Sequence, residues 1–259
     1  MSDILEELSS LRRQDAEQAS QARPLATLMR QIEDLPPATD FCAPFASEGV
    51  NIIAELKKAS PSEGLIRADF DPISIATDYA ANGAAAMSVL CEPHRFLGSE
   101  DYLKAVHAAV PTPLLYKDFL TTEYQIAAAR VAGASACLLI AAVLKQPDLA
   151  RLLRFAHEVG LTALVETHTL DEVKCAADVG ARLVGVNCRD LRTFKTDPNL
   201  TAELVARIPA ELVKIGESGL KTHDDILKVK AAGANGFLIG TTLMRAPSPG
   251  AKLRELRGN

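Results

Sequence analysis

The sequence alternates short apolar runs with helix-like segments, and this alternation restricts the fold more than any other feature. The runs are nearly continuous in Val, Ile, Leu and Ala, which is typical of strands buried on both faces of a parallel sheet. They start roughly 20 to 35 residues apart, which leaves room for a strand, a helix and two loops. The eight runs are 52–56, 85–90, 113–116, 136–142, 162–165, 183–186, 212–215 and 236–239.

Glycine follows several of the helix-like segments, directly before the next apolar run. A glycine just past a helix C-terminus commonly adopts the left-handed conformation that ends the helix. Residues in this place are Gly83, Gly133, Gly160, Gly180 and Gly233. Eight strand-and-helix units predict an α/β fold, the (β/α)₈ or TIM barrel. The alternative is a doubly wound sheet, which usually has fewer strands, and its frequent G-x-G-x-x-G turn does not occur in the sequence.

The first fifty residues differ from the rest because they carry few strand signals. Ile4, Leu5 and Leu8 have helical spacing, and a second helical segment, 25–32, ends before a Leu-Pro-Pro break. We expect residues 36–49 to form a loop. The sequence therefore predicts an N-terminal helical extension, residues 1–50, packed on a catalytic barrel of residues 51–259 as one structural domain.

Composition and charge exclude several classes of function. The net charge is −5 and no Lys/Arg block occurs, so we expect no nucleic-acid partner. No apolar run approaches the roughly 18 residues of a membrane span, and the N-terminus lacks the apolar region of a secretory signal. The five cysteines contain no C-x-x-C, and the five histidines show no metal-ligand spacing. We expect a cytoplasmic protein, most simply a monomer, with no metal and no membrane partner.

Polar side chains follow most of the apolar runs, at the strand ends where such barrels place their active sites. In run 52–56 the faces alternate, so Ile53, Glu55 and Lys57 share one face. Taken alone, Glu55 and Lys57 indicate a structural ion pair. Further strand ends carry Lys117, Glu166, Asn187 and Ser218, and several ionisable groups at one rim would shift each other's pKa values. This pattern favours an active site over a structural ring of ion pairs.

Small residues follow the last two runs, and they indicate a phosphate site. Phosphate commonly binds after strands seven and eight of such barrels, on backbone N–H groups and a helix N-terminus. The residues concerned are Ser218, Gly219, Gly240 and Thr241, although ordinary tight turns would have the same composition. His168, Asp190 and Asp197 are not selected as site residues, since rim or solvated loop positions account for them.

Several segments resemble those of one enzyme family, indole-3-glycerol-phosphate synthase, in order and in spacing over nearly the whole chain. The resemblance implies closure of an indole ring on 1-(2-carboxyphenylamino)-1-deoxyribulose 5-phosphate, with loss of CO₂ and water, in tryptophan biosynthesis. It also implies a carboxy-lyase that needs no metal or organic cofactor. The matching segments are IIAELKKASPSEGLI, SVLCEPHRFLGS, LYKDFL, LLIAAVL, ALVETHT, VGVNCRDLRTF, GESGL and FLIGTTLMR.

The resemblance implies a role for each matching residue. Lys117 corresponds to the general acid that protonates the ketone oxygen, and Lys57 to a second lysine used in dehydration. Glu166 corresponds to a proton-handling carboxylate, and Glu55 to the carboxylate that orients Lys57. The remaining matches are Asn187 and Ser218 on the anthranilate and ribulose parts, Ser60 and Arg189 as anion contacts, Phe96 as the aryl wall, and Gly219, Gly240 and Thr241 as the phosphate cradle.

The sequence departs from the family at three positions. Tyr116 stands where many members have Arg, Cys188 where many have a second Asn, and Thr241 where Ser is commoner. None of these changes removes a matched catalytic group. We also expect residues 60–64 to form a lid over the cavity. The alternatives are an aldolase that forms a Schiff base on Lys117 and a non-catalytic barrel that binds a phosphometabolite or a protein.

Overall fold

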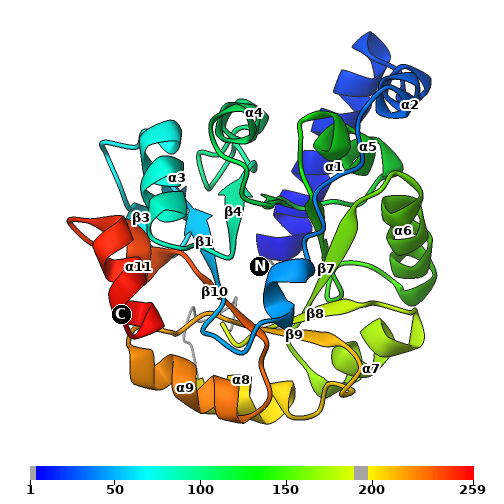
Figure 1. The fold of residues 1–259 in the computed structure, drawn as a ribbon. Coiled ribbons are helices and arrows are strands. Elements are labelled where there is room, and N and C mark those ends of the chain that lie inside the picture. The colour runs from blue at the N-terminus through cyan, green and yellow to red at the C-terminus, as the bar shows by residue number, and fades with distance from the viewer. Residues whose placement is uncertain (1–3, 190–197) are drawn as a thin grey trace.

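Eight parallel strands close into a barrel in the structure, a computed structural model that describes residues 4–189 and 198–259. Each barrel strand pairs with the next one along the chain, and the last pairs with the first (Figure 1). The barrel strands are β1 (Ile52–Leu56), β4 (Ala86–Leu90), β5 (Leu114–Lys117), β6 (Ala136–Ile140), β7 (Thr162–Thr167), β8 (Leu183–Asn187), β9 (Val213–Glu217) and β10 (Gly236–Ile239). The predicted (β/α)₈ barrel is confirmed.

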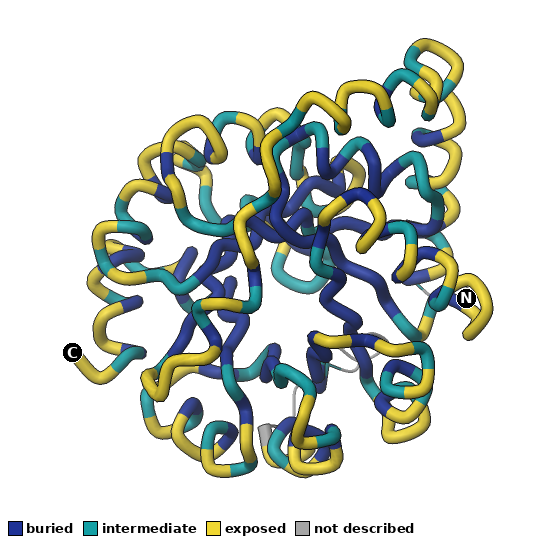
Figure 2. Tube along the Cα trace, turned by 45° about the vertical axis from the view of Figure 1, so that its right-hand side comes forward, coloured by how far each residue is buried: buried dark blue, intermediate teal, exposed yellow. Residues whose placement is uncertain are grey.

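Helices follow the strands and surround the barrel, and Figure 2 shows their outer faces exposed around a buried centre. The helices after the strands are α3 (Pro72–Ala81), α4 (Glu100–Ala109), α5 (Glu123–Val131), α6 (Gln146–Glu158), α7 (Leu170–Asp178), α8 (Pro198–Val205), α9 (His223–Ala231), α10 (Thr241–Met244) and α11 (Pro249–Arg257). Side chains such as Thr122, Thr169 and Thr222 accept bonds from first-turn N–H groups and so fix where helices begin. The predicted helix-ending glycines all have positive φ, as Gly83 (82°) and Gly133 (98°) illustrate.

The two faces of each strand pack in different layers. Ile53, Leu115 and Ile215 belong to the cluster that fills the barrel, whereas Ile52, Ala54 and Leu56 pack outward against the helices. The predicted alternation in residues 52–56 is therefore confirmed. Because inward residues recur at every second position, Glu55 lies on the same face as Ile53.

The N-terminal segment contacts the barrel at both ends. Helix α1 (Ile4–Ala22) begins at the carboxyl ends of the strands, and α2 (Leu25–Glu33) packs beside α5 (Figure 1). The chain then turns through the short helix η1 (Ala43–Ala46), whose Phe45 lies against Gly236 at the opposite end of the barrel. Residues 36–49, predicted as a loop, therefore contain one helical turn.

Several predicted strand ends are wrong, and for one physical reason. Predicted strands stop at the last apolar residue, but β5, β7, β8 and β9 continue through polar residues that line the cavity: Lys117, Glu166, Asn187 and Glu217. Run 136–142 is instead shorter, because the N–H groups of Val143 and Leu144 bond back to the carbonyl of Ile140 and form a turn. The predicted lid loop is part of a small hairpin, β2 (Ala59–Ser60) with β3 (Gly64–Leu65).

Candidate active site

A cavity of about 790 Å³ lies at the carboxyl ends of the barrel strands. Ile4, Leu5 and Leu8 of helix α1 form part of its wall, so the extension contributes to the same cavity as the barrel. All the site residues predicted from the sequence line it: Glu55, Lys57, Ser60, Phe96, Lys117, Glu166, Asn187, Arg189, Ser218, Gly219, Gly240 and Thr241.

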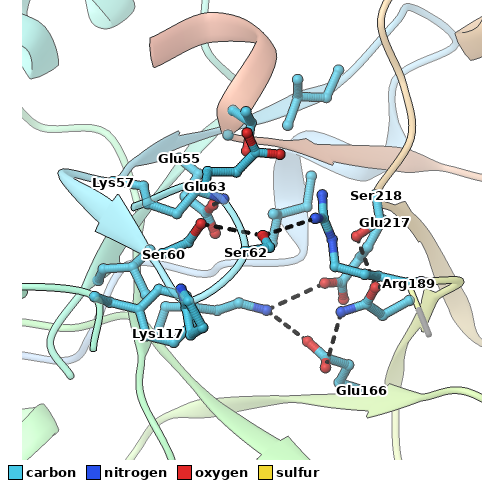
Figure 3. Close-up of a pocket in the computed structure, with 18 of the residues that line it drawn as sticks. Glu55, Lys57, Ser60, Ser62, Glu63, Lys117, Glu166, Arg189, Glu217 and Ser218 are labelled. Atoms are coloured by element: carbon cyan, nitrogen blue, oxygen red, sulfur yellow. Dashed lines mark hydrogen bonds and ion pairs between the residues drawn. The ribbon is translucent and has the colours of Figure 1, made fainter. Parts of the chain in front are cut away.

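Lys117 lies at the centre of a hydrogen-bonded group of inward-facing side chains (Figure 3). Its Nζ lies 2.7 Å from Oε2 of Glu166 and 3.2 Å from Oε2 of Glu217. Nδ2 of Asn187 donates to Oε1 of Glu166 at 3.2 Å, and Oγ of Ser218 donates to Oδ1 of Asn187 at 2.7 Å. Side chains from β5, β7, β8 and β9 thus hold one ammonium group at a fixed point in the cavity.

The charges in this group are buried, and this changes their proton affinities. Burial opposes the ammonium form of Lys117, but Glu166 and Glu217 raise its pKa well above the ordinary value. Burial also opposes ionisation of Glu166, yet Lys117 and His168 lower its pKa. Burial and the nearby charge of Glu166 raise the pKa of Glu217 to about 8. At neutral pH the group therefore contains the ammonium of Lys117 as an acid and the carboxylate of Glu166 as a base. It also contains the carboxyl of Glu217, which titrates close to neutral pH.

Glu55 and Lys57 form the ion pair that their spacing indicates. Lys57 Nζ lies 2.7 Å from Oε1 of Glu55, and both side chains line the cavity. Gly240, at the end of β10, makes room for them, because a Cβ there would lie 2.1 Å from Oε1 of Glu55. The pair is thus both a salt bridge and part of the cavity wall.

The hairpin β2–β3 borders the mouth of the cavity (Figure 3). Oγ of Ser60 and Oγ of Ser62 lie 3.4 Å apart, and Nη1 of Arg189 donates to Oγ of Ser62 at 3.2 Å. Glu63 forms an ion pair with Arg245, which also lines the cavity. The hairpin is therefore tied to residues that follow β8 and α10.

An apolar wall and a polar wall face each other across the barrel. Phe96 and Phe119, with ring centroids 6.3 Å apart, follow β4 and β5. Ser218 and Gly219, with φ of 63° and 76°, follow β9 and form a turn with two left-handed residues in succession. Since β5 and β9 lie on opposite sides of the barrel, a ligand between the walls meets an apolar surface at one end and backbone amides at the other.

Two buried glutamates were not among the predicted site residues. Glu217 bonds to Lys117, and the carboxylate of Glu92 accepts bonds from the N–H groups of His94, Arg95 and Phe96 at 2.6–2.9 Å. The signal for Glu217 is present in the sequence, because Glu217 follows Ile215 by two residues as Glu55 follows Ile53. Glu92 holds the turn that carries Phe96, and its role depends on a loop conformation that the sequence does not indicate.

Two of the three residues that depart from the family pattern lie away from the cavity, whereas the third, Thr241, lines it. Tyr116 and Cys188 are buried in the layer between the barrel and the helices. Asp190 and Asp197 lie outside the described residues. Within residues 4–189 and 198–259, no three His, Cys, Asp or Glu side chains converge on a metal-sized site, and no helix is long and apolar enough to cross a membrane.

Comparison with known proteins identifies the family. The model for indole-3-glycerol phosphate synthase matches residues 5–256. The chain belongs to the indole-3-glycerol phosphate synthase family. The indole-3-glycerol phosphate synthase of Alkaliphilus metalliredigens is 42% identical over 255 residues, 98% of each chain, and that of Laribacter hongkongensis is 44% identical over 263 residues, 99% of each chain. The family that the sequence motifs indicate is confirmed.

Solved structures show the same fold at low sequence identity. A 3-hexulose-6-phosphate synthase superposes with a TM-score of 0.66 at 15% identity, over 81% of this chain and 99% of that chain. The 3-hexulose-6-phosphate synthase from Salmonella typhimurium gives 0.66 at 13% identity, over 81% and 97%. These structures match the barrel of the indole-3-glycerol phosphate synthase family, and their likeness is one of fold alone.

Proposed function

We propose that the chain performs the carboxy-lyase reaction of its family in the cavity around Lys117. The substrate is 1-(2-carboxyphenylamino)-1-deoxyribulose 5-phosphate, and the product is indole-3-glycerol phosphate, an intermediate of tryptophan biosynthesis. One observation carries the proposal: a buried ammonium, flanked by two glutamate side chains, lies between an apolar wall and a glycine-rich turn. A substrate with an aryl ring at one end and a phosphate at the other matches that arrangement.

Lys117 acts as the general acid of ring closure. The aryl carbon that bears the carboxylate attacks the ketone carbon, a carbon–carbon bond forms, and the ketone oxygen becomes negative. The Lys117 ammonium stabilises this oxygen and transfers a proton to it. The carboxylate then leaves as CO₂, and its bonding electrons restore the aromatic ring. Burial of Lys117 supports this role because ammonium–oxyanion attraction is stronger away from water.

Glu166 and Lys57 act in the dehydration step. The hydroxyl group formed on ring closure receives a proton and leaves as water. A second proton is then lost from the adjacent carbon of the new ring. Lys57, held by Glu55, is the donor, and Glu166 is the acceptor. The lowered pKa of Glu166, which Lys117 and His168 maintain against burial, supports a base that is ionised at neutral pH.

The remaining site residues bind the substrate. Asn187 and Ser218 hydrogen-bond the anthranilate and ribulose parts, and Arg189 and Ser60 contact its anionic groups. Phe96 packs on the aryl ring. Gly219, Gly240 and Thr241 hold the phosphate on backbone N–H groups and a hydroxyl. The left-handed turn at Ser218 and Gly219 supports this assignment, since such turns direct successive N–H groups to one side.

An assay of indole formation tests the proposal. The protein converts the anilino-deoxyribulose phosphate to a fluorescent indole product without added metal. Lys117→Met lowers kcat by about 10²- to 10⁴-fold, the contribution typical of a general acid. The matched control is Lys104→Met, because Lys104 forms only half-exposed ion pairs on α4. An inactive wild type overturns the proposal, and covalent trapping of a ketose phosphate on Lys117 by borohydride supports the aldolase alternative instead.

The setting of the enzyme is also part of the proposal. We place it in the cytoplasm, which agrees with five free cysteines, three of them buried. We propose that the protein acts as a monomer, with which a cavity lined by one chain is consistent. Residues 1–50 and 51–259 form one structural domain. Sedimentation tests the monomer, fractionation tests the compartment, and a single cooperative unfolding transition tests the domain.

A further inference from the structure

His168 lies beside the catalytic group but has no part in the proposed reaction. It follows β7, two residues after Glu166, and its side chain is 16% exposed. Its Nε2 lies 3.5 Å from Oε1 of Glu166, and its Nδ1 lies 3.4 Å from Oε2 of Glu172 on α7. The imidazole ring therefore stands between two carboxylates, one inside the cavity and one at the start of a helix.

The second carboxylate is fixed by the backbone. Oε2 of Glu172 accepts the N–H of His168 at 2.7 Å, and the N–H of Glu172 donates to Oγ1 of Thr169, the residue that caps α7. These bonds hold Glu172 in place whatever the charge of the imidazole. The backbone of His168 is thus tied to Glu172 at the start of α7, and its ring lies within ion-pair distance of both carboxylates without a hydrogen bond to either.

The contacts of Glu166 leave one place for a second positive charge. Oε2 of Glu166 receives Lys117, while Oε1 receives the neutral amide of Asn187 and faces His168. Lys117 is shared with a second carboxylate, that of Glu217. When Glu217 ionises, one ammonium lies between two buried carboxylates, and the resulting excess of negative charge is costly in a buried site.

We propose that His168 is a positioning residue for Glu166: as an imidazolium held by Glu172, it keeps Glu166 ionised and fixes its Oε1, while Lys117 fixes its Oε2. This inference rests on the proposed role of Glu166 as a base. The titratable groups that face His168 are Glu166 on the preceding strand, Glu172 on α7 and Glu217 on β9. All three are acidic, so they favour the protonated ring.

The proton affinity of the ring agrees with this geometry. Burial alone would lower the pKa of His168, but Glu172 and Glu166 raise it above the ordinary value of 6.5. This shift favours the protonated ring, whose charge is lost as the pH rises through the pKa of the folded state. The charge of His168 therefore affects catalysis at low pH, where Glu166 and Glu217 compete for protons.

Kinetics as a function of pH, combined with NMR, tests the inference. In His168→Gln the acid limb of kcat moves to higher pH by about one unit, because the carboxylates lose a nearby cation. The deficit of the variant is largest at low pH and disappears at high pH, where the wild-type ring is itself neutral. KM changes by less than about twofold, since uniform binding is not affected. The ring ¹⁵N signals of His168 in the wild type show an imidazolium at pH 7.

Two further variants separate the possible failures. Glu172→Gln keeps an acceptor for the N–H of His168 but removes the charge, so the imidazole titrates at lower pH by NMR. His157→Gln, on the exposed end of α6, leaves both the profile and the His168 signal unchanged. If His168→Gln does not fold, Glu172→Gln and the wild-type NMR titration decide the question.

The outcome for Glu166 is measured in parallel. Glu166→Gln lowers kcat by at least about 10²-fold if the proposed base is right. If Glu166→Gln remains active, the proposed function of Glu166 fails on its own account. If Glu166→Gln is inactive while His168→Gln has the wild-type pH profile, or if His168 is neutral at pH 7, the inference about His168 is overturned and the proposed function stands.

Discussion

Two glycines inside the barrel leave space for carboxylates on the adjacent strands. A Cβ on Gly185 would lie 2.1 Å from Oε1 of Glu217, and one on Gly240 would lie 2.1 Å from Oε1 of Glu55. Gly240 has a φ of −116°, so its backbone does not require glycine. At these positions the missing side chain, rather than backbone freedom, decides where a charged group can stand.

Gly240→Ala is therefore expected to reduce activity by displacing an ion pair. The methyl group would lie 2.1 Å from Oε1 of Glu55 and 3.0 Å from Nζ of Lys57, so both must move. Because a shift of about 1 Å in a catalytic group can cost on the order of 100-fold, we expect kcat/KM to fall by about 10- to 100-fold. The matched control is Gly49→Ala, where the nearest atom, Oδ1 of Asn51, lies 3.8 Å from the added carbon. Equal kcat/KM in the two variants would contradict the steric argument.

Single residues show what the sequence predicts well and what it does not. Lys117 and Glu166 are predictable, since each ends a strand whose inward parity follows from its apolar residues. Glu217 also lies on the inward face of its strand, but Ser218 and Gly219 directly after it make the segment resemble a turn. Arg12, which reaches a barrel side chain 106 positions away, has no local signal because its partner is set by the docking of a whole helix.

Helix α1 is joined to the barrel by a buried ion pair between two elements far apart in sequence. Nη2 of Arg12 lies 2.6 Å from Oδ2 of Asp118, whose side chain is fully buried directly after β5. Asp118 also follows Lys117, so the attachment of the helix and the position of the ammonium share one segment of chain. Burial raises the pKa of Asp118, and Arg12 opposes that rise.

Arg12→Met is expected to destabilise the protein by about 3 kcal/mol at pH 8, since it leaves a buried carboxylate without its cation. The loss is smaller at pH 5, because Asp118 without Arg12 takes up a proton more readily and becomes neutral. Urea unfolding at the two pH values measures the difference. Arg30→Met on the exposed face of α2 is the control, with a change within about 0.5 kcal/mol. A pH-independent loss would show that packing of the Arg12 stem dominates over its charge.

Elements were predicted more reliably than their ends. The apolar runs identify all eight barrel strands, because a parallel sheet covered on both faces requires such runs. Strand β9 nevertheless continues to Glu217, where burial is compensated by Lys117 rather than by apolar contact. Strand ends that carry buried polar groups of the cavity are thus the places where hydrophobicity no longer predicts the structure and partner contacts determine it instead.

At the scale of the whole molecule, a buried carboxyl group inside the barrel makes the protein less stable as the pH rises. Glu217 is 1% exposed, and Gly185 gives its Oε1 the space it occupies. The pKa of Glu217 is raised from 4.5 to about 8, so between these values the folded state holds a proton that the unfolded chain has released. The stabilisation that this proton provides is complete below pH 4.5 and is lost as the pH rises to about 8, by up to about 1.4 kcal/mol per unit.

Glu217→Gln is expected to raise stability at alkaline pH and to lower activity. Glutamine has nearly the same shape but does not titrate, so the variant and the wild type differ little at pH 5. At pH 8.5 the variant is more stable by on the order of 2 to 4 kcal/mol, because only the wild type ionises a buried group. The kcat of the variant falls, since Lys117 loses one of its two glutamate contacts, and the variant would then gain stability at the expense of activity.

Urea midpoints between pH 5 and pH 9 measure the effect of Glu217→Gln, with the exposed Glu203→Gln as a control whose stability difference from the wild type does not change with pH. A constant stability difference across this range would mean that Glu217 keeps the same charge in the folded and unfolded states.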